Sequence, residues 1–306
     1  MVPPRKTLRL DLLGGVQVGY RASGDKLDRS KPTLVLFNPF TTTADYYLPE
    51  FENKALLDAA NLVAIEPLGH GQSKLEKGET FTYWDSAAMA LGTLDRLGVQ
   101  EAFAAGTSQG GWIAARMALL APERIKGIIL IGSSMDSESP RSRELGCWNG
   151  QEATSGLVTV AGDFTPAHDF DPGTGYNDFL MDIGFGKTVD QKTKDFWLAS
   201  IRENYSGDTG KRSICQAAVT LASRDGLHER LPYIRCPVLW LQGTGDVVFS
   251  FENAQQAIKL FTNSPEARLV KFSDGVHFLS WTHKEKLHEE VLNFVKKAGG
   301  FAKASL

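Results

Sequence analysis

Alternating apolar and polar residues near the N-terminus predict a pair of edge strands. The segments Lys6–Leu12 and Val16–Tyr20 alternate in this way, and Gly14 and Gly15 lie between them. A period of two residues places one face of a strand on a core and the other in water. Because paired glycines suit a tight turn between antiparallel strands, we predict a hairpin at one edge of a sheet.

Short, mostly apolar runs predict the remaining strands, because a strand covered on both faces does not need to alternate. Six segments are assigned in this way: Thr33–Phe37, Leu62–Ile65, Glu101–Ala105, Ile125–Ile131, Cys236–Gln242 and Ala267–Phe272. Between them lie segments of helical length and composition: Trp84–Leu97, Trp112–Leu120, Glu252–Phe261 and Lys284–Lys297. Strands that alternate with helices predict an α/β fold, in which helices cover both faces of a mostly parallel sheet.

One long segment, residues 136–212, breaks this alternation because it contains no strong buried strand. It holds a Gly-, Pro- and Asp-rich piece from Asp163 to Gly186 and a predicted helix, Gln191–Tyr205. We therefore predict an insertion that divides the core into residues 1–135 and 213–306. Its aromatic side chains could pack the insertion onto the core, cover an apolar pocket, or do both: Trp148, Phe164, Phe170, Tyr176, Phe179, Phe185, Phe196, Trp197 and Tyr205.

Composition excludes several classes of protein. The 306 residues are 42% apolar and 23% charged, which is typical of a globular protein with a large core. The net charge of −3 and the lack of a basic run argue against a nucleic-acid partner. No apolar stretch approaches the length of a membrane span, and the N-terminus lacks the apolar core of a secretory signal.

The cysteines favour a reducing compartment. Cys147, Cys215 and Cys236 are odd in number and far apart, which suits free thiols better than a disulfide framework. Neither a Cys-x-x-Cys nor a His-Glu-x-x-His motif occurs in the sequence. We therefore expect a cytoplasmic protein without a metal ion or other cofactor.

The segment Gly106–Gly111, Gly-Thr-Ser-Gln-Gly-Gly, carries the strongest chemical signal. A Gly-x-Ser-x-Gly motif between a strand and a helix is typical of a nucleophile elbow, in which a tight turn exposes the serine hydroxyl. Here the motif would expose Ser108, and the backbone N–H of Gln109 would open the helix, where an anion is favoured. The motif alone is weak in a chain with 30 glycines, so a base and an acid are also required.

An acid and a base follow the serine in the order that such sites need. Asp246 comes directly after the strand Cys236–Gln242, in the sequence Gly-Thr-Gly-Asp. His277 comes shortly after Ala267–Phe272, in the sequence Gly-Val-His. Because ligands of open parallel sheets bind beyond the carboxyl ends of the strands, we expect Ser108, Asp246 and His277 to converge there.

Four motifs together resemble those of the α/β-hydrolase-fold family, and more closely its capped serine hydrolases. They are Gly69–Ser73 (Gly-His-Gly-Gln-Ser), Gly106–Gly111, Gly243–Asp246 and Gly275–His277, and the resemblance extends over nearly the whole chain. It implies an eight-stranded, mostly parallel sheet. It also implies that the insertion after the sixth strand, residues 136–212, is a mainly helical cap.

The resemblance also implies roles for individual residues. Ser108 would be the nucleophile, His277 would take and return its proton, and Asp246 would orient the imidazole. The backbone N–H groups of Phe40 and Gln109 would form the oxyanion hole.

The loop that contains Phe40 departs from the family pattern. Many members carry His-Gly before the oxyanion residue, whereas Asn38 and Pro39 stand here, and the proline stiffens the loop. The following Thr41, Thr42 and Thr43 could offer a hydroxyl to the substrate or could be ordinary turn residues. We take Thr41, together with Trp148 of the cap, as candidate substrate-binding residues.

Other acidic and histidine residues are weaker candidates. Asp136 follows the sixth strand, where some family members place the acid, but Asp246 has the better local context. His70 lies in a glycine-rich loop and is expected to be structural. The remaining histidines carry no expected role: His283 and His288 on a polar terminal helix, where we expect them to be solvated, and His168 and His228, which have no partner visible in the sequence.

A serine nucleophile favours acyl transfer to water over the aspartyl-ester chemistry of epoxide hydrolases and haloalkane dehalogenases. The aromatic-rich insertion favours a small or medium, uncharged molecule. The first hypothesis is therefore a carboxylic-ester or lactone hydrolase, with a homodimer as the candidate assembly. The alternatives are a carbon–carbon bond hydrolase of a diketone-type substrate, a lyase or acyltransferase, and a ligand receptor that retains the triad, because the fold alone does not separate them.

Overall fold

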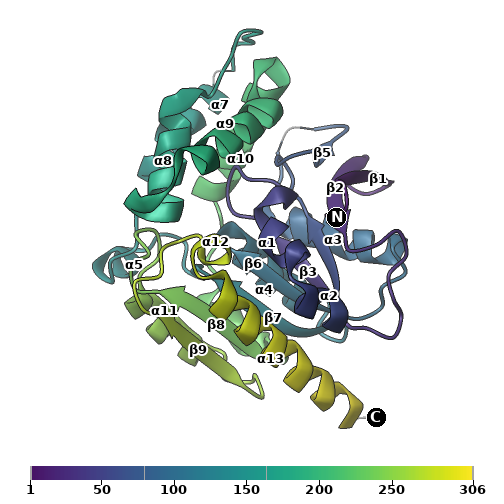
Figure 1. The fold of residues 1–306 in the computed structure, drawn as a ribbon. Helices are drawn as coiled ribbons and strands as arrows, with labels where there is room; N and C mark the ends of the chain where they lie inside the picture. Colours follow the sequence, from purple (N-terminus) through teal and green to yellow (C-terminus); the bar gives the residue numbers. More distant parts are fainter. Residues whose placement is uncertain (1, 79, 163, 305–306) are drawn as a thin grey trace.

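A single sheet forms the centre of the molecule (Figure 1). The computed structural model describes residues 2–304 other than 79 and 163. The strands lie in the order β1-β2-β4-β3-β6-β7-β8-β9, and the two-residue β5 (Lys74–Leu75) pairs with β2 off this path. The eight strands of the path are β1 (Lys6–Leu10), β2 (Val16–Ala22), β3 (Thr33–Phe37), β4 (Asn61–Ile65), β6 (Ala102–Thr107), β7 (Ile125–Ile131), β8 (Val238–Gly243) and β9 (Ala267–Phe272).

The predicted hairpin is confirmed as β1 and β2, which pair antiparallel. Strand β2 also runs antiparallel to β4, whereas every neighbouring pair from β4 to β9 is parallel. The prediction of a mostly parallel sheet is therefore confirmed, and the short β5 is an addition to it. Because parallel strands share their carboxyl ends, the loops after β3, β6, β8 and β9 lie at one end of the sheet.

Helices cover both faces of the sheet, as the alternation of elements predicts. In β3, Val35 and Phe37 belong to the apolar core beneath α3, α4 and α11, whereas Leu34 and Leu36 belong to the core that α2 and α13 cover. This division follows from the pleat of a strand, which directs successive side chains to opposite faces. The helices outside the insertion are α1 (Leu48–Glu52), α2 (Lys54–Ala59), α3 (Tyr83–Arg96), α4 (Gln109–Leu120), α11 (Phe251–Ala257), α12 (Leu279–Thr282) and α13 (Lys284–Ala304).

The segment between β7 and β8 carries a group of helices, the last four of which Figure 1 shows together at one end of the sheet. They are α5 (Pro140–Glu144), α6 (Gly150–Ala153), α7 (Ser155–Gly162), α8 (Gly173–Phe185), α9 (Gln191–Tyr205) and α10 (Gly207–Ala222). The predicted helix at α9 is confirmed to the residue. Residues 136 and 212 remain our proposed limits of the cap, and position 212 falls inside α10.

Helix α8 was not predicted, because it lies within the Gly-, Pro- and Asp-rich piece. That piece begins at Asp163, which lies outside the described residues. The helix nevertheless buries Asn177, Leu180, Met181 and Gly184, which recur every three or four residues and so share one face. Packing of this face onto the core outweighs the low helix propensity of the glycines.

Six of the nine aromatic rings named for the insertion fall into two sets. Phe185, Trp197 and Tyr205 are buried in the apolar core and anchor the cap; the ring of Trp197, for example, lies 6.4 Å from that of Tyr46, measured between centroids. Trp148, Tyr176 and Phe179 instead line a pocket above the sheet. Both uses that the sequence left open therefore occur, with different rings serving each one.

The structure places three of the remaining histidines, and His288 contradicts the expectation that it is solvated. His288 is not solvated: it is buried at 6% exposure, and the Asn53 amide donates a hydrogen bond to its Nδ1 over 2.7 Å. Helix α13 packs this side against α2, so a polar residue faces the interior. His168 does have a partner, because its Nδ1 lies 2.6 Å from an Asp208 carboxylate oxygen. His283 ends α12 and is half-buried.

None of the helices that the structure describes combines the length and hydrophobicity needed to traverse a bilayer.

Candidate active site

The turn between β6 and α4 is a single residue, Ser108. Strand β6 continues to Thr107 and α4 begins at Gln109, so the strand ends two residues later and the helix begins three residues earlier than predicted. Ser108 has φ 55° and ψ −121°, a conformation that non-glycine residues rarely adopt. Such strain persists only where the surroundings fix the backbone, and it is common at functional sites.

The flanking glycines are required because the chain passes very close to itself. A Cβ atom at Gly106 would lie 2.0 Å from the carbonyl carbon of Gly110. A Cβ atom at Gly110 would lie 2.0 Å from the backbone oxygen of Phe37, at the end of β3. The glycines of the motif therefore allow α4 to start directly against the sheet, which is the geometry of a nucleophile elbow.

Two hydrogen bonds to its main chain hold Ser108 in this position. Its N–H donates to the backbone oxygen of Ile131 over 2.9 Å, and the Ser133 hydroxyl donates to the Ser108 carbonyl over 2.8 Å. Both partners belong to β7 or the loop that follows it. The backbone of Ser108 is thus fixed by the neighbouring strand, while its side chain lines the pocket beneath the cap.

Asp246 and His277 form a buried carboxylate–imidazole pair. Nδ1 of His277 lies 2.9 Å from Oδ2 of Asp246 and 3.1 Å from Oδ1. The carboxylate also accepts the N–H groups of Val248 over 2.8 Å and Phe249 over 3.1 Å, and the Gln242 amide over 3.0 Å. Because these donors stabilise the charged form, the carboxylate can hold the proton of a neutral imidazole on Nδ1 and leave Nε2 free to accept.

Ser108 and His277 line the same pocket, so the structure brings together the three residues that the sequence singled out. In the described part of the chain, Asp246 supplies the hydrogen bonds of the His277 ring, and none joins it to the Ser108 hydroxyl. Such catalytic bonds often tighten only when substrate is bound. The competing acid, Asp136, instead accepts a hydrogen bond from the Ser139 hydroxyl.

The expected oxyanion donors have free N–H groups. Within residues 2–304, apart from 79 and 163, neither the Phe40 N–H nor the Gln109 N–H donates a hydrogen bond. The first N–H groups of a helix have no partner inside it, which applies to Gln109 as the first residue of α4. Phe40 also lines the pocket beside Ser108. The two donors therefore suit an anion that forms at this position.

The side chain of Gln109 fastens the loop of residues 38–42 to the core. Its amide nitrogen donates to the backbone oxygen of Asn38 over 3.3 Å and to Nε2 of His70 over 2.9 Å. His70 Nδ1 lies 3.0 Å from the Leu68 carbonyl, so the ring is protonated on Nδ1 and accepts on Nε2. Burial lowers the pKa of His70 to about 4, which keeps the ring neutral at pH 7. His70 is structural, as expected, and it supports the oxyanion loop.

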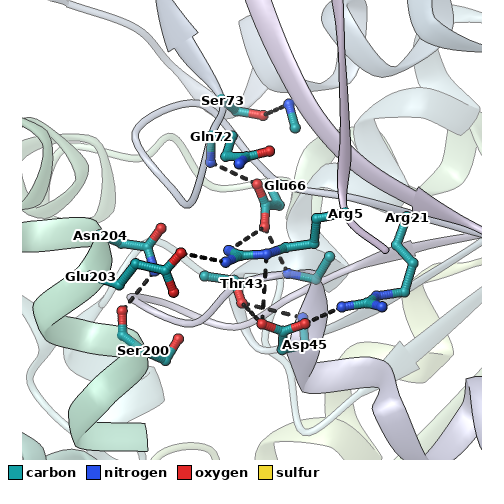
Figure 2. Close-up of polar contacts among 12 residues, drawn as sticks. Arg5, Arg21, Thr43, Asp45, Glu66, Gln72, Ser73, Ser200, Glu203 and Asn204 are labelled. Atoms are coloured by element: carbon teal, nitrogen blue, oxygen red, sulfur yellow. Dashed lines mark hydrogen bonds and ion pairs between the residues drawn. The ribbon is translucent and has the colours of Figure 1, made fainter. Parts of the chain in front are cut away.

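A charged network holds the next part of the same loop (Figure 2). Glu66 is fully buried and accepts the N–H groups of Ala44 over 3.1 Å and Gln72 over 2.7 Å. The Arg5 guanidinium lies 3.6 Å from Glu66 and reaches a carboxylate oxygen of Glu203, on cap helix α9, over 2.9 Å. Burial raises the pKa of Glu66, and the arginine and the two N–H groups oppose this effect.

Sequence reasoning missed this network because its members are far apart in the chain. Asp45 completes it, with an oxygen 3.7 Å from Nε of Arg5 and an ion pair to Arg21. The only local signal is Glu66, a charged residue directly after a buried strand and before the glycine-rich loop.

The pocket above Ser108 is narrow and mostly apolar, with a volume of about 40 Å³. Trp148, a candidate from the sequence, lines it. Thr41 does not line it: the Thr41 side chain is buried behind the pocket wall, where its hydroxyl contacts that of Tyr176 over 2.8 Å. The full lining is Pro39, Phe40, Ser108, Trp148, Ala153, Thr154, Leu157, Tyr176, Phe179, Leu180, Ile183, Leu221, Val248, His277 and Phe278.

Among the residues that the structure describes, no three His, Cys, Asp or Glu side chains gather as metal ligands would. The three cysteines are free thiols, and two of them, Cys147 and Cys215, are buried.

This fold and site place the protein in a known class. Residues 32–284 match the α/β hydrolase fold family, and the chain belongs to that family. The protein is therefore an α/β hydrolase, which agrees with the sheet, the elbow and the position of the acid and base.

Among sequence relatives, the chain is 23% identical to 2-hydroxy-6-oxononadienedioate/2-hydroxy-6-oxononatrienedioate hydrolase of a Pseudomonas species, over 94% of each protein. It is 31% identical over 117 residues to the dihydrolipoyllysine-residue acetyltransferase component of an acetoin cleaving system of Cupriavidus necator. That match covers 38% of this chain and 29% of the acetyltransferase component, so the chain spans well under half of that relative.

Solved structures share the fold at low sequence identity. A thermophilic esterase from Thermogutta terrifontis superimposes with a TM-score of 0.74 at 18% identity, covering 96% of this chain and 99% of the esterase. The enol-lactonase from Burkholderia xenovorans LB400 gives a TM-score of 0.72 at 20% identity, covering 94% and 100%.

Proposed function

We propose that the protein is a serine hydrolase that cleaves a small or medium, largely apolar ester or lactone through an acyl-enzyme. The observation that carries this proposal is the Asp246–His277 pair, joined at 2.9 Å, in the same pocket as a serine at the apex of a strained elbow. The backbone conformation of Ser108 is unfavourable for folding alone, and the three residues together match the needs of acyl transfer.

The mechanism uses each group in turn. Nε2 of His277 accepts the proton of Ser108 as Oγ attacks the carbonyl carbon, and Asp246 stabilises the imidazolium that forms. The N–H groups of Phe40 and Gln109 hold the oxyanion. The imidazolium then protonates the leaving alkoxide. Water, deprotonated by His277, releases the acid from Ser108 in the same manner.

The lining of the pocket supports a neutral substrate. In the described part of the chain no lysine or arginine contributes to it, so a carboxylate far from the reacting carbonyl would be buried without a partner. A dioate, the substrate class named for the Pseudomonas relative, has two carboxylates. We therefore rank the carbon–carbon bond hydrolase as the second candidate, supported by the length of that match, and the ester or lactone hydrolase first.

The experiment is a panel of nitrophenyl esters of short to medium acids, with uncharged lactones and an ω-carboxylated ester beside them. We expect many turnovers per chain, a preference for uncharged acyl groups, and a fall in kcat of roughly 10⁴–10⁶-fold in Ser108→Ala. Selective turnover of a diketone-type or carboxylated substrate would favour the second candidate. About one turnover per chain with tight binding would favour a receptor.

We also propose, from the sequence alone, a small-molecule substrate as the natural partner, a cytoplasmic location, and a homodimer as the candidate assembly.

A further inference from the structure

The cap touches the oxyanion loop through two hydroxyl groups. Tyr176 projects from cap helix α8, and its hydroxyl oxygen lies 2.8 Å from Oγ1 of Thr41. The same Oγ1 lies 2.8 Å from the carbonyl oxygen of Phe40. Phe40 supplies one of the two proposed oxyanion donors, and Tyr176 itself lines the substrate pocket. One chain of hydrogen bonds thus runs from the pocket wall to the residue that carries the donor.

The direction of these hydrogen bonds is fixed by chemistry. A carbonyl oxygen can only accept, so the single hydroxyl proton of Thr41 must point to Phe40. The remaining bond must then be donated by Tyr176 to Thr41. Burial raises the pKa of the Tyr176 hydroxyl well above its usual value, so this proton is retained at neutral pH.

Thr41 is held in an unusual conformation. Its φ is 57°, in the left-handed region that a β-branched residue rarely enters, and it is 1% exposed. A residue in such a conformation stays there only because its surroundings hold it. The surroundings of its hydroxyl are one core group, the Phe40 carbonyl, and one cap group, Tyr176.

We propose that Tyr176 is a positioning residue for the oxyanion hole: through Thr41 it orients the Phe40 backbone when the cap is closed. The kinetic part of this inference rests on the proposed hydrolase function. The cap therefore has a role beyond covering the substrate, since the donor that stabilises the oxyanion is held partly from the cap side. Opening of the cap removes this hydrogen bond and loosens the donor.

Three substitutions test this chain of hydrogen bonds from Tyr176 through Thr41 to Phe40, with kcat and KM measured on the ester that the wild type hydrolyses fastest. Tyr176→Phe keeps the ring and removes the donor, and we expect kcat to fall about five- to tenfold with KM changed less than about twofold. Thr41→Val removes the shared oxygen and should lower kcat at least as much. Thr41→Ser keeps the hydroxyl and should retain kcat within about twofold. Because the two hydroxyls act as one unit, the double variant Tyr176→Phe/Thr41→Val should be no slower than Thr41→Val alone.

A matched control is available in the same cap. Tyr205, on α9, is 1% exposed, and its hydroxyl has no hydrogen-bond partner within the described residues. Tyr205→Phe therefore removes one buried tyrosine hydroxyl without breaking a bond, and it should leave kcat unchanged. A kcat of Tyr176→Phe within twofold of the wild type, or multiplicative losses in the double variant, would overturn the proposal.

Amide hydrogen exchange separates this proposal from the proposed function, because it needs no substrate. Backbone amides in residues 38–45 should exchange faster in Tyr176→Phe than in the wild type or in Tyr205→Phe. Unchanged exchange in that segment would overturn the coupling of the cap to the loop. Faster exchange in a protein that turns over no ester would support the coupling and overturn the hydrolase function instead.

Discussion

The two walls of the pocket are built on different principles. The core wall holds Ser108, Phe40 and His277 beyond the carboxyl ends of β6, β3 and β9. Hydrogen bonds with β7 and the loop after it fix Ser108, and a hydrogen bond with the segment after β8 fixes His277. The cap wall is made largely of apolar side chains such as Phe179 and Ile183. Under the proposed function, this difference means that the core supplies the reacting groups, whereas most of the cap wall sets the shape and polarity of the space around them.

The walls meet at one loop, residues 38–45, which is fastened from both sides. From the core, Gln109 bonds to the Asn38 carbonyl and to His70. From the cap, Tyr176 bonds to Thr41. Neutral groups make both of these contacts. A third contact is charged, because Arg5 pairs with Asp45 of the loop and with Glu203 of the cap. The side chain of Glu203 is exposed, which makes the charged link the weaker and more salt-sensitive of the two cap contacts.

The largest effect should come from the acid on the core wall. Asp246→Asn places an amide against Nδ1 of His277 and favours the wrong tautomer, so kcat should fall by about 10⁴-fold. Asp136 lies at the start of the cap segment and hydrogen-bonds Ser139 instead, so Asp136→Asn should change kcat less than about threefold. Steady-state kinetics of both variants give the comparison. A larger loss in Asp136→Asn than in Asp246→Asn would show that Asp136, not Asp246, is the acid.

A smaller effect is expected on the free energy of unfolding, which should depend on pH through His70, the core residue that supports this loop through Gln109. The pKa of His70 is about 4 in the folded protein and about 6.5 when unfolded. Between these values the unfolded chain binds a proton that the folded one does not, so the free energy of unfolding falls as the pH drops from about 6.5 to 4. The full span amounts to about 3 kcal/mol.

The His70→Gln variant isolates this contribution. Urea unfolding of both proteins at several pH values measures the free energy of unfolding. Its decrease between about pH 6.5 and 4 should be about 3 kcal/mol smaller in the variant, because glutamine does not titrate. The Tyr176–Thr41 contact contains no group that titrates in this range, so the change in pH should leave this hydrogen bond between the cap and the loop intact. Equal pH dependence of the two proteins would show that His70 does not supply this term.

The sequence predicts the core wall well because its signals are local. Each of Ser108, Asp246 and His277 follows a strand whose own residues reveal it, and parallel strands bring their ends together. The glycines of the elbow indicate that backbone segments pass too close together for any side chain, and the surroundings of Gly106 and Gly110 confirm this.

Apart from Trp148, the cap wall could not be predicted, because it depends on contacts between distant segments. The glycines in α8 lower its helix propensity, so the sequence does not predict the helix. Which of its residues are buried is seen only in the packed structure. Nothing in the sequence distinguishes Tyr176, which lines the pocket, from Tyr205, which anchors the cap. The Arg5 network and the burial of His288 likewise join residues that are far apart in the chain.

The most direct test of the central claim is the intact mass of the protein after incubation with a nitrophenyl alkylphosphonate. This reagent transfers its phosphonyl group to an activated serine and releases nitrophenolate. We predict one phosphonyl group per chain, located by peptide mapping on Ser108, with parallel loss of ester hydrolysis and little labelling of His277→Ala. Undiminished hydrolysis by an unlabelled protein, or by one labelled elsewhere, would contradict the account.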